Sequence, residues 1–161
     1  MEFSKYTLPG IYIVKPDAFH ERTQIRLELD KISKNIFNLE LTLNKEDVLN
    51  LYSDPIIQQS IPYVVNYMLS GLCELNVVLL ESYDSFTNLI GVKTVPKKCM
   101  SSSLRYQFGK DSEKIGDIYL VRNGIHRTKD QNEFLKDFLV FRKYIELFNN
   151  HNQYIEDLLN S

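Results

Sequence analysis

The chain has 161 residues, of which 43% are hydrophobic, and this is enough for one compact domain with a substantial core. Its formal net charge of −2 gives no overall attraction to nucleic acid or to an anionic membrane. Six glycines and five prolines are too few for a fibrous or linker-dominated protein.

The termini and cysteines favour a cytoplasmic protein. No apolar run is long enough to span a bilayer, and the amino-terminal segment MEFSKYTLPG lacks the apolar core of a signal peptide. Cys73 and Cys99 form no CxxC pair, which is typical of reduced thiols. The sequence also lacks zinc-ligand spacing and a Walker A loop.

The first third of the chain alternates between strand and helix patterns. Residues 10–15 are a short β-rich run that stops at Pro16, which predicts a buried strand. Residues 21–34 carry apolar side chains at helical spacing, which predicts an amphipathic helix. In residues 36–43, apolar and polar side chains alternate, which predicts a strand with one buried and one solvated face. The apolar face of this strand consists of Phe37, Leu39, Leu41 and Leu43.

Two helices are predicted next. Asn44, with Asp47 three residues later, has the pattern of a capped helix start, and the helix is expected over residues 45–52. A second helix runs through Pro62 to Leu69 and stops at Gly71.

The second half contains two further strands. Residues 73–80 (CELNVVLL) predict a third strand, and residues 84–90 a short helix. Residues 92–104 are expected to be irregular, and residues 117–122 (DIYLVR) to be the fourth strand. Residues 130–148 predict a long helix with an inward apolar face formed by Phe134, Phe138, Phe141 and Ile145.

This order indicates an α+β protein. Without the additional helices it is βαββαβ, the ferredoxin-like arrangement with a four-stranded antiparallel sheet. No repeat or linker is visible, so residues 1–161 are interpreted as one domain. Because many functions share this fold, the fold alone does not identify the function.

Five stretches, taken in order, resemble the motifs of one enzyme family. They are IYIVKPDAF at 11–19, YVVNYMLSG at 63–71, LIGVKTVP at 89–96, SLRYQFG at 103–109 and RNGIHRTKD at 122–130. Together they resemble the nucleoside diphosphate kinases over about residues 9–143, with a carboxy-terminal extension at 144–161. The resemblance implies a kinase-like fold and a ping-pong transfer of the γ-phosphoryl group through a phosphohistidine.

The resemblance assigns the nucleophile to His126, just after the predicted fourth strand. An imidazole with a pKa of about 6.5 is neutral enough at pH 7 to attack phosphorus. It must be held in one tautomer, and Asp137 stands eleven residues on, where the family has a longer acid. Thr128 matches a serine of the family and supplies a supporting hydroxyl. The alternative is that His126 is an ordinary histidine in a surface turn, without a role in catalysis.

Further residues match the family's nucleotide contacts. Lysine and arginine side chains neutralise phosphate charge, and hydroxyl and amide groups complete the contacts. The implied nucleotide-binding residues are Lys15, Tyr52, Ser60, Val64, Thr94, Arg105 and Asn123. Each has a structural alternative: Lys15 as a solvated strand end, Tyr52 as a packing residue, and Asn123 as part of an Asn-Gly turn.

Several positions depart from the family pattern. The second phosphate-binding arginine is replaced by Thr87, and Lys93, Arg122 and Arg127 are candidate replacements. The glycine after the histidine is Arg127, which adds bulk and charge.

Three further departures concern the nucleotide and the region beside it. The aromatic residue that stacks on the base falls at Ser60, which leaves Val64 as an apolar contact. The acid three residues after the histidine is Lys129, although Asp130 follows. A polar insertion near 109–117 is expected to be a surface loop close to the site.

Three functions remain open. The first is a working nucleoside diphosphate kinase that uses ATP and other nucleoside tri- and diphosphates, with Mg²⁺ carried by the phosphates. The second is a catalytically impaired relative that acts as a nucleotide-binding or protein-interaction module. The third is an unrelated ferredoxin-like regulatory domain.

The resemblance also implies a homo-oligomer, either a hexamer or another dimer-based assembly. The strand at 36–43 has a solvated face suited to pairing across a two-fold axis. The extension at 144–161 is expected to be a packed helix, with an interface role as the alternative.

Overall fold

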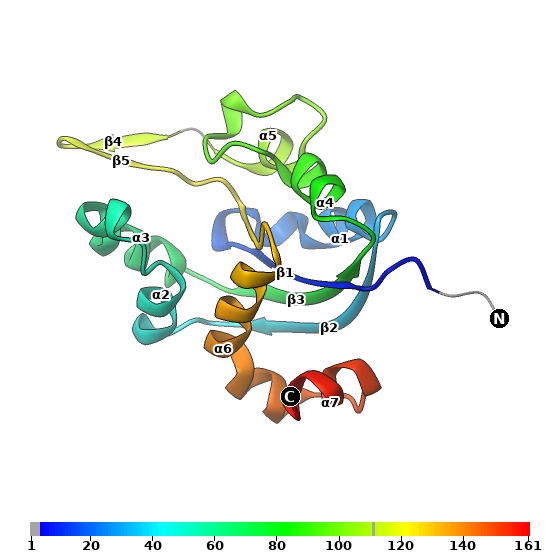
Figure 1. Ribbon diagram of the computed structural model, residues 1–161. Helices are drawn as coiled ribbons and strands as arrows, with labels where there is room; N and C mark the ends of the chain where they lie inside the picture. The colour runs from blue at the N-terminus through cyan, green and yellow to red at the C-terminus, as the bar shows by residue number, and fades with distance from the viewer. Residues whose placement is uncertain (1–3, 111) are drawn as a thin grey trace.

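A four-stranded antiparallel sheet forms the centre of the computed structural model, which describes residues 4–110 and 112–161 (Figure 1). The strand order is β2-β3-β1-β6. The four strands are β1 (Leu8–Val14), β2 (Ser33–Leu41), β3 (Cys73–Leu80) and β6 (Ile125–Arg127). The predicted ferredoxin-like βαββαβ fold is therefore confirmed.

Helices cover both faces of this sheet. The α-helices are α1 (Arg22–Leu29), α2 (Lys45–Leu51), α3 (Ile61–Met68), α4 (Tyr83–Ile90), α5 (Leu104–Phe108), α6 (Gln131–Phe148) and α7 (Gln153–Leu159). Short 3-10 helices occupy Pro16–Glu21, Pro55–Ser60 and Pro96–Lys98. Among the described residues, no helix combines the length and apolar character needed to cross a membrane.

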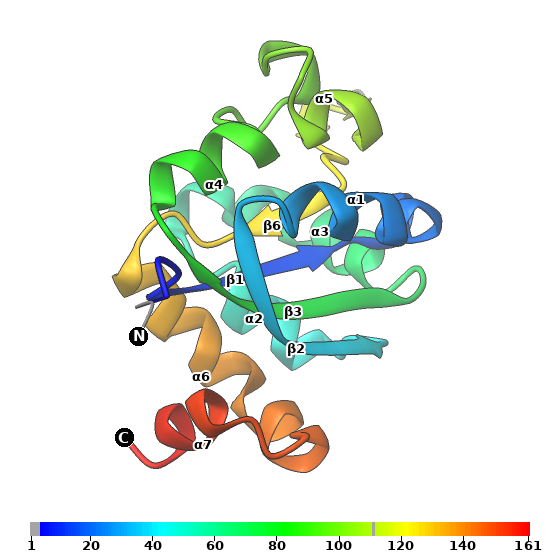
Figure 2. The same cartoon turned by 90° about the vertical axis from the view of Figure 1, so that its right-hand side faces the viewer.

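The two-residue period of β1 creates two hydrophobic cores. Ile11 and Ile13 face the layer formed by α2, α3, α6 and α7, whereas Tyr12 and Val14 face α1, α4 and α5. Figure 2 shows the sheet between these two layers. Because β1 and β3 lie in the middle of the sheet, both of their faces are buried.

β3 also brings polar groups into the interior. Glu74 and Asn76 are fully buried on the face covered by α1. Arg26 Nε lies 3.4 Å from Glu74 Oε1, and Asn76 Nδ2 donates to the same oxygen at 3.0 Å. Asn38 of β2 donates to Asn76 Oδ1 at 2.7 Å. These contacts offset the cost of burying a carboxylate beneath a helix.

The start of α2 confirms the predicted cap and connects it to α6. Asn44 Oδ1 accepts from the Asp47 amide at 2.8 Å, and the Asp47 carboxylate accepts from the Asn44 amide at 3.2 Å. The same carboxylate accepts from Lys143 Nζ at 2.6 Å and Tyr144 Oη at 2.5 Å. The cap residue therefore also fixes the position of α6.

The prediction of the fourth strand at 117–122 was wrong. Part of that stretch, β5 (Ile118–Leu120), instead pairs with β4 (Glu113–Ile115) in a separate two-stranded hairpin. Gly116 provides the turn at φ +63°. The fourth strand of the sheet is β6, so His126 lies within a strand rather than after one, paired with Ile13.

The same hairpin corrects the loop expected at 109–117. Residue 111, like residues 1–3 of the amino-terminal segment, lies outside the described residues, but β4 begins at Glu113. The stretch DIYLVR does contain a strand, as its alternating pattern indicated, but this strand pairs with β4 rather than with β1.

One helix prediction needed correction, and one short helix was not predicted. The helix expected over 21–34 ends at Leu29, where Ser33 Oγ donates to the Leu29 carbonyl at 2.7 Å and β2 begins. A register irregularity between Asn35 and Phe37 lets β2 start earlier than its alternation suggested. The helix α5 was not predicted, although Ser103 caps it by accepting from the Tyr106 amide.

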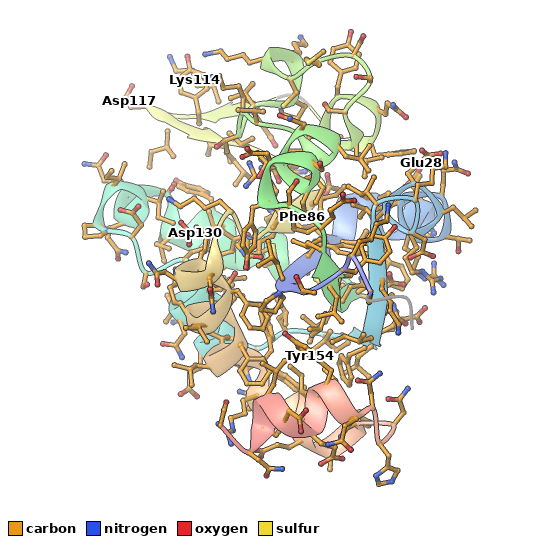
Figure 3. All side chains as sticks on the ribbon, turned by 45° about the vertical axis from the view of Figure 1, so that its right-hand side comes forward. Glu28, Phe86, Lys114, Asp117, Asp130 and Tyr154 are labelled. Carbon is orange, nitrogen blue, oxygen red and sulfur yellow. The ribbon has the colours of Figure 1, made fainter. Side chains whose placement is uncertain are left out.

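The carboxy-terminal extension packs against the domain. Phe134, Phe138, Phe141 and Ile145 of α6 are buried as expected, and Ile155 of α7 is fully buried in the same core. Asn149 Nδ2 donates to Glu156 Oε1 at 2.7 Å across the connection. In Figure 3, Tyr154 of α7 lies at the opposite end of the molecule from Lys114 and Asp117 on the hairpin.

Replacing Phe86 by alanine tests the core beneath α4. Figure 3 labels Phe86 on α4. Its ring is fully buried and meets Tyr12 edge to face, with 6.3 Å between the centroids. We expect Phe86→Ala to lower the free energy of unfolding by about 3–5 kcal/mol in urea denaturation, because a large cavity remains. Leu139→Ala is the control, since this side chain is 69% exposed, and it should change stability by less than about 0.5 kcal/mol. Equal effects of the two substitutions would contradict this description of the core.

Candidate active site

A cavity of about 340 Å³ opens beside β6, between α3, α6 and the β4–β5 hairpin. It brings together side chains from six separate segments of the chain. The sequence-predicted residues that line it are Lys15, Tyr52, Ser60, Val64, Thr94, Arg105, Asn123 and His126. Lys15 directly follows β1 and His126 lies in β6, and these two strands pair with each other.

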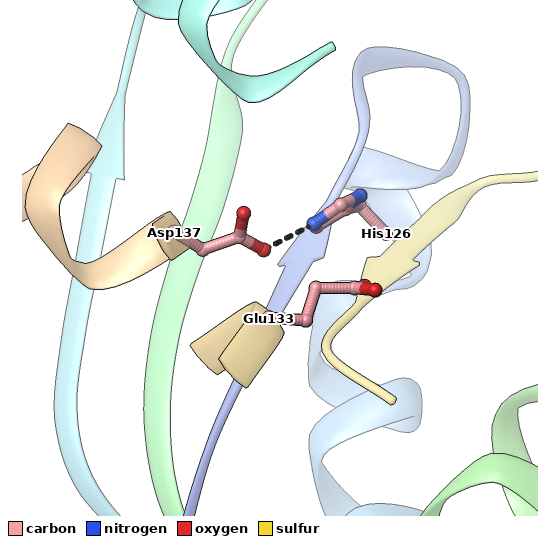
Figure 4. A group of neighbouring side chains, drawn as sticks. All are labelled: His126, Glu133 and Asp137. Carbon is pink, nitrogen blue, oxygen red and sulfur yellow. Dashed lines mark hydrogen bonds and ion pairs between the residues drawn. The ribbon is translucent and has the colours of Figure 1, made fainter. Parts of the chain in front are cut away.

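His126 is held by a carboxylate behind it. Its Nε2 lies 2.7 Å from Asp137 Oδ2, and the Asp137 side chain is fully buried in α6 (Figure 4). If Nε2 carries the proton and donates it to the carboxylate, the neutral ring has its lone pair on Nδ1. The shorter acid therefore does reach the imidazole, because Asp137 projects directly from the helix that follows β6.

Tyr52 supports the same imidazole from the side. The two rings meet edge to face with centroids 5.7 Å apart and an interplanar angle of 77°. Burial raises the pKa of the Tyr52 hydroxyl above its usual range, so the phenol remains neutral. Its ring thus orients His126 without adding charge.

Lys15 is a buried cation at the end of β1. Its side chain is 5% exposed, and Nζ donates to Asn123 Oδ1 at 2.8 Å. Asn123 Nδ2 in turn donates to the Thr94 carbonyl at 3.2 Å. Burial, reinforced by the positive charge of Arg105, lowers the pKa of Lys15 from 10.5 to about 7. Lys15 Nζ also lies 5.6 Å from the ring centroids of both Tyr52 and Tyr67. None of these contacts brings a negative charge, so an anion in the cavity would stabilise the ammonium form.

Arg105 connects the loops around the cavity. Its Nε and Nη2 donate to the Ile125 carbonyl at 3.1 and 3.0 Å, and Nη1 donates to the carbonyls of Gly91 and Lys93 at 3.1 and 3.0 Å. Burial lowers the pKa of this guanidinium to about 10, with a further contribution from Arg127. Most of its five N–H donors are therefore committed to the backbone, and its charge reaches the cavity mainly through space.

Of the candidate replacements for the arginine missing at Thr87, only Arg127 lines this cavity. Its Nη2 donates to the Gly91 carbonyl at 3.0 Å, while its buried Nε has no hydrogen-bond partner. Arg122 instead pairs with Glu113 at 3.0 Å, and Lys93 contributes its backbone carbonyl to Arg105. Arg127, which stands where the family has a glycine, is thus also the best placed of these residues to replace the second phosphate-binding arginine.

Thr128 is separate from the cavity. Its side chain is fully buried, and Oγ1 accepts from the Ile11 amide at 3.0 Å, which joins β6 to β1. The hydroxyl expected to support the histidine is occupied by this backbone contact.

His126, Glu133 and Asp137 form the one group in the described part of the chain with the composition of a metal site, with one ligand atom each within 4.8 Å of the others. Figure 4 shows the two acids on successive turns of α6. Asp137 already holds His126, and the cations Lys15, Arg105 and Arg127 line the same cavity. This charge favours an anion over a bare metal ion.

Solved structures share this architecture. Nucleoside diphosphate kinase from Borrelia burgdorferi with bound vanadate and ADP superposes with a TM-score of 0.70 and 19% identity, covering 86% of this chain and 88% of that one. The enzyme from Halobacterium salinarum in complex with CDP gives 0.70 and 17%, covering 84% and 88%. The Aquifex aeolicus enzyme gives 0.69 and 18%, covering 83% and 94%.

The chain has the nucleoside diphosphate kinase fold. No family model and no curated protein matches its sequence. The likeness was therefore visible in short motifs and in the backbone, rather than in overall sequence.

Some residues lining the cavity of this kinase-like fold were not predicted. They are Ile57, Tyr67, Val92, Tyr119, Leu120, Val121 and Glu133. A signal existed for Glu133, which precedes Asp137 by one helical turn and so shares its face of α6. The hairpin residues carried no signal because their pairing partner was assigned incorrectly.

The buried state of Lys15 predicts a pH-dependent cost in stability. Between about pH 7 and 10.5 the unfolded chain keeps a proton that the native chain has lost, so the contribution of Lys15 to stability rises with pH over this range. We compare the free energy of unfolding of Lys15→Met with that of wild type. We expect this difference, in favour of Lys15→Met, to be larger by roughly 4 kcal/mol at pH 6.5 than at pH 10. Urea denaturation at each pH measures this difference. The variant also loses the hydrogen bond to Asn123, but this loss affects stability at both pH values. A difference between the two proteins that does not change with pH would therefore contradict the assigned pKa.

Proposed function

We propose that this protein is a nucleoside diphosphate kinase that transfers the γ-phosphoryl group of a nucleoside triphosphate through His126. The observation that carries the proposal is the 2.7 Å contact between His126 Nε2 and Asp137, which leaves Nδ1 as the nucleophilic nitrogen beside a cation-lined cavity. The shared fold supports it, because three of the residues expected from the motifs, Lys15, Arg105 and Asn123, lie around the same cavity.

In the first half-reaction, the lone pair on Nδ1 attacks the γ-phosphorus. The bond from that phosphorus to its bridging oxygen breaks, and the electron pair leaves on the nucleoside diphosphate. Asp137 keeps the proton on Nε2 and stabilises the positive charge that the ring acquires. In the second half-reaction, a terminal oxygen of another diphosphate attacks the phosphohistidine and regenerates His126.

The cations of the cavity match the charge that moves in this reaction. Lys15 is proposed to contact phosphate oxygens directly, since an anion compensates its burial. Arg127 is proposed to take the role of the arginine missing at Thr87, and Arg105 to add charge from behind while it holds the surrounding loops. Tyr52 is proposed to keep the imidazole oriented during both steps.

Mg²⁺ fits this site as part of the nucleotide. It prefers oxygen ligands, and Glu133 is the carboxylate among the described residues lining the cavity. The phosphates would therefore provide most of the ligands, with Glu133 as the candidate protein ligand. When bound, the ion neutralises charge on the transferring phosphates.

The remaining assignments follow from the same proposal. The chain is proposed to act as one cytoplasmic domain, with its core over about residues 9–143 and the extension at 144–161. A homo-oligomer built on dimers is proposed because β2 is an edge strand of the sheet. The alternative, a kinase-like module without turnover, draws support from Arg105, whose donors are mostly used by the backbone.

The phosphohistidine provides the direct test. The protein is incubated with ATP and Mg²⁺, and we expect an acid-labile, base-stable phosphoryl adduct that His126→Ala abolishes. His151→Ala is the matched control, because this histidine side chain is 93% exposed at the connection before α7, and its adduct should equal that of wild type. Absence of an adduct on folded wild type would favour the module without turnover. An adduct that persists in His126→Ala would refute the nucleophile.

A further inference from the structure

Two chemically different sets of residues line the cavity. The cationic set is Lys15, Arg105 and Arg127, and the apolar set, here called the apolar wall, is Ile57, Val64, Val92, Tyr119 and Leu120. A ligand that contacts both sets must carry negative charge and also an apolar or aromatic group. Inorganic polyphosphate satisfies only the first condition.

Tyr119 is the exposed aromatic residue of the apolar wall. The residue is 62% exposed and lines the cavity from β5. Lys114, its cross-strand partner in β4, places Nζ 5.8 Å from the ring centroid. The ammonium occupies one side of the ring, and the polar end of the lysine remains in solvent, where Figure 3 shows it on the projecting hairpin.

The other aromatic residues of the cavity have partners within the protein. Tyr52 meets the His126 ring, and Tyr67 is buried and donates to Asp17. β5 contacts the 3-10 helix Pro55–Ser60, in which Ser60 Oγ donates to the Ile57 carbonyl at 2.8 Å. The cavity therefore obtains an exposed aromatic ring from the inserted hairpin and aliphatic surface from Ile57 and Val64.

We propose that Tyr119 is a substrate-selecting residue whose ring stacks on the nucleobase, opposite the aliphatic side chains of α3 and the preceding 3-10 helix. This inference rests on the proposed function, because it places the phosphates of the same ligand at Lys15 and His126. Every base presents a π-face, so stacking selects nucleotides over inorganic polyphosphate without selecting among bases. The insertion is then part of the substrate site, and it compensates for Ser60.

Binding of two ligands to wild type and Tyr119→Ala tests the stacking. Calorimetry with ADP and with inorganic tripolyphosphate, both with Mg²⁺, separates the contacts to phosphate from the contacts to the base. We expect Tyr119→Ala to weaken ADP binding by about 5- to 150-fold, the range for removing one stacking partner, and to leave tripolyphosphate binding unchanged. Tyr119→Phe should restore ADP binding, because the ring and not the hydroxyl makes the contact.

Two further variants complete the experiment. Tyr106→Ala removes another exposed tyrosine, which is 48% exposed on α5 and outside the cavity lining, and it should bind ADP as wild type does. The chain contains no tryptophan, so Tyr119→Trp introduces a single indole whose fluorescence should respond to ADP and not to tripolyphosphate.

The outcomes separate this inference from the proposed function. Unchanged ADP binding in Tyr119→Ala, with phosphohistidine still formed by wild type, overturns the stacking role alone. Equal losses for ADP and tripolyphosphate also overturn it, because the ring then affects phosphate binding rather than contact with the base. If wild type binds neither ligand, both the inference and the proposed function fail.

Discussion

The arrangement of the candidate site depends on one buried guanidinium. Arg105 donates to the carbonyls of Ile125, Gly91 and Lys93, so it ties the start of β6 to the loop that follows α4. Gly91 adopts φ +136°, and a Cβ placed there would lie 2.9 Å from Cys99 Sγ and 3.0 Å from the Arg105 side chain. Only glycine lets the backbone at position 91 approach the Arg105 side chain this closely, and so lets the guanidinium reach these carbonyls. His126 and Thr94, which follow Ile125 and Lys93 in the chain, are positioned by the same contacts.

A site built in this way accumulates more positive than negative charge, since Glu133 is the carboxylate that lines it among the described residues. Lys15, Arg105 and Arg127 lie in or beside one cavity, and burial lowers the pKa of each. Such an arrangement costs stability in the free protein, as is common where side chains are positioned for binding rather than for packing. An anionic ligand that binds only the folded chain would recover part of that cost and stabilise the protein.

The fold could be predicted from the sequence wherever periodicity and packing coincide. β3 was located at its observed bounds because eight consecutive residues are buried there, and the inward face of α6 followed from its helical spacing. The fourth strand could not be located, because residues 125–127 are a short run, whereas the longer β-like run at 117–122 satisfies its pairing locally. Strand pairing is a tertiary property, and local propensity does not decide it.

The candidate site was predictable to a similar degree. The motif positions identified Lys15, Asn123 and His126, and the cavity contains all three. Tyr119 was invisible, since its position depends on the hairpin, and the commitment of Thr128 to Ile11 depends on the register of β6 against β1.

The near-neutral pKa of Lys15 also connects ligand binding to the solution. At a pH above about 7, much of the free protein holds this amine without its proton. A phosphate group beside the amine favours the ammonium form, so each binding event draws a proton from the buffer. Affinity for an anionic ligand at this amine would thus fall as the medium becomes alkaline, and one side chain would couple occupancy of the cavity to the acidity of the surroundings.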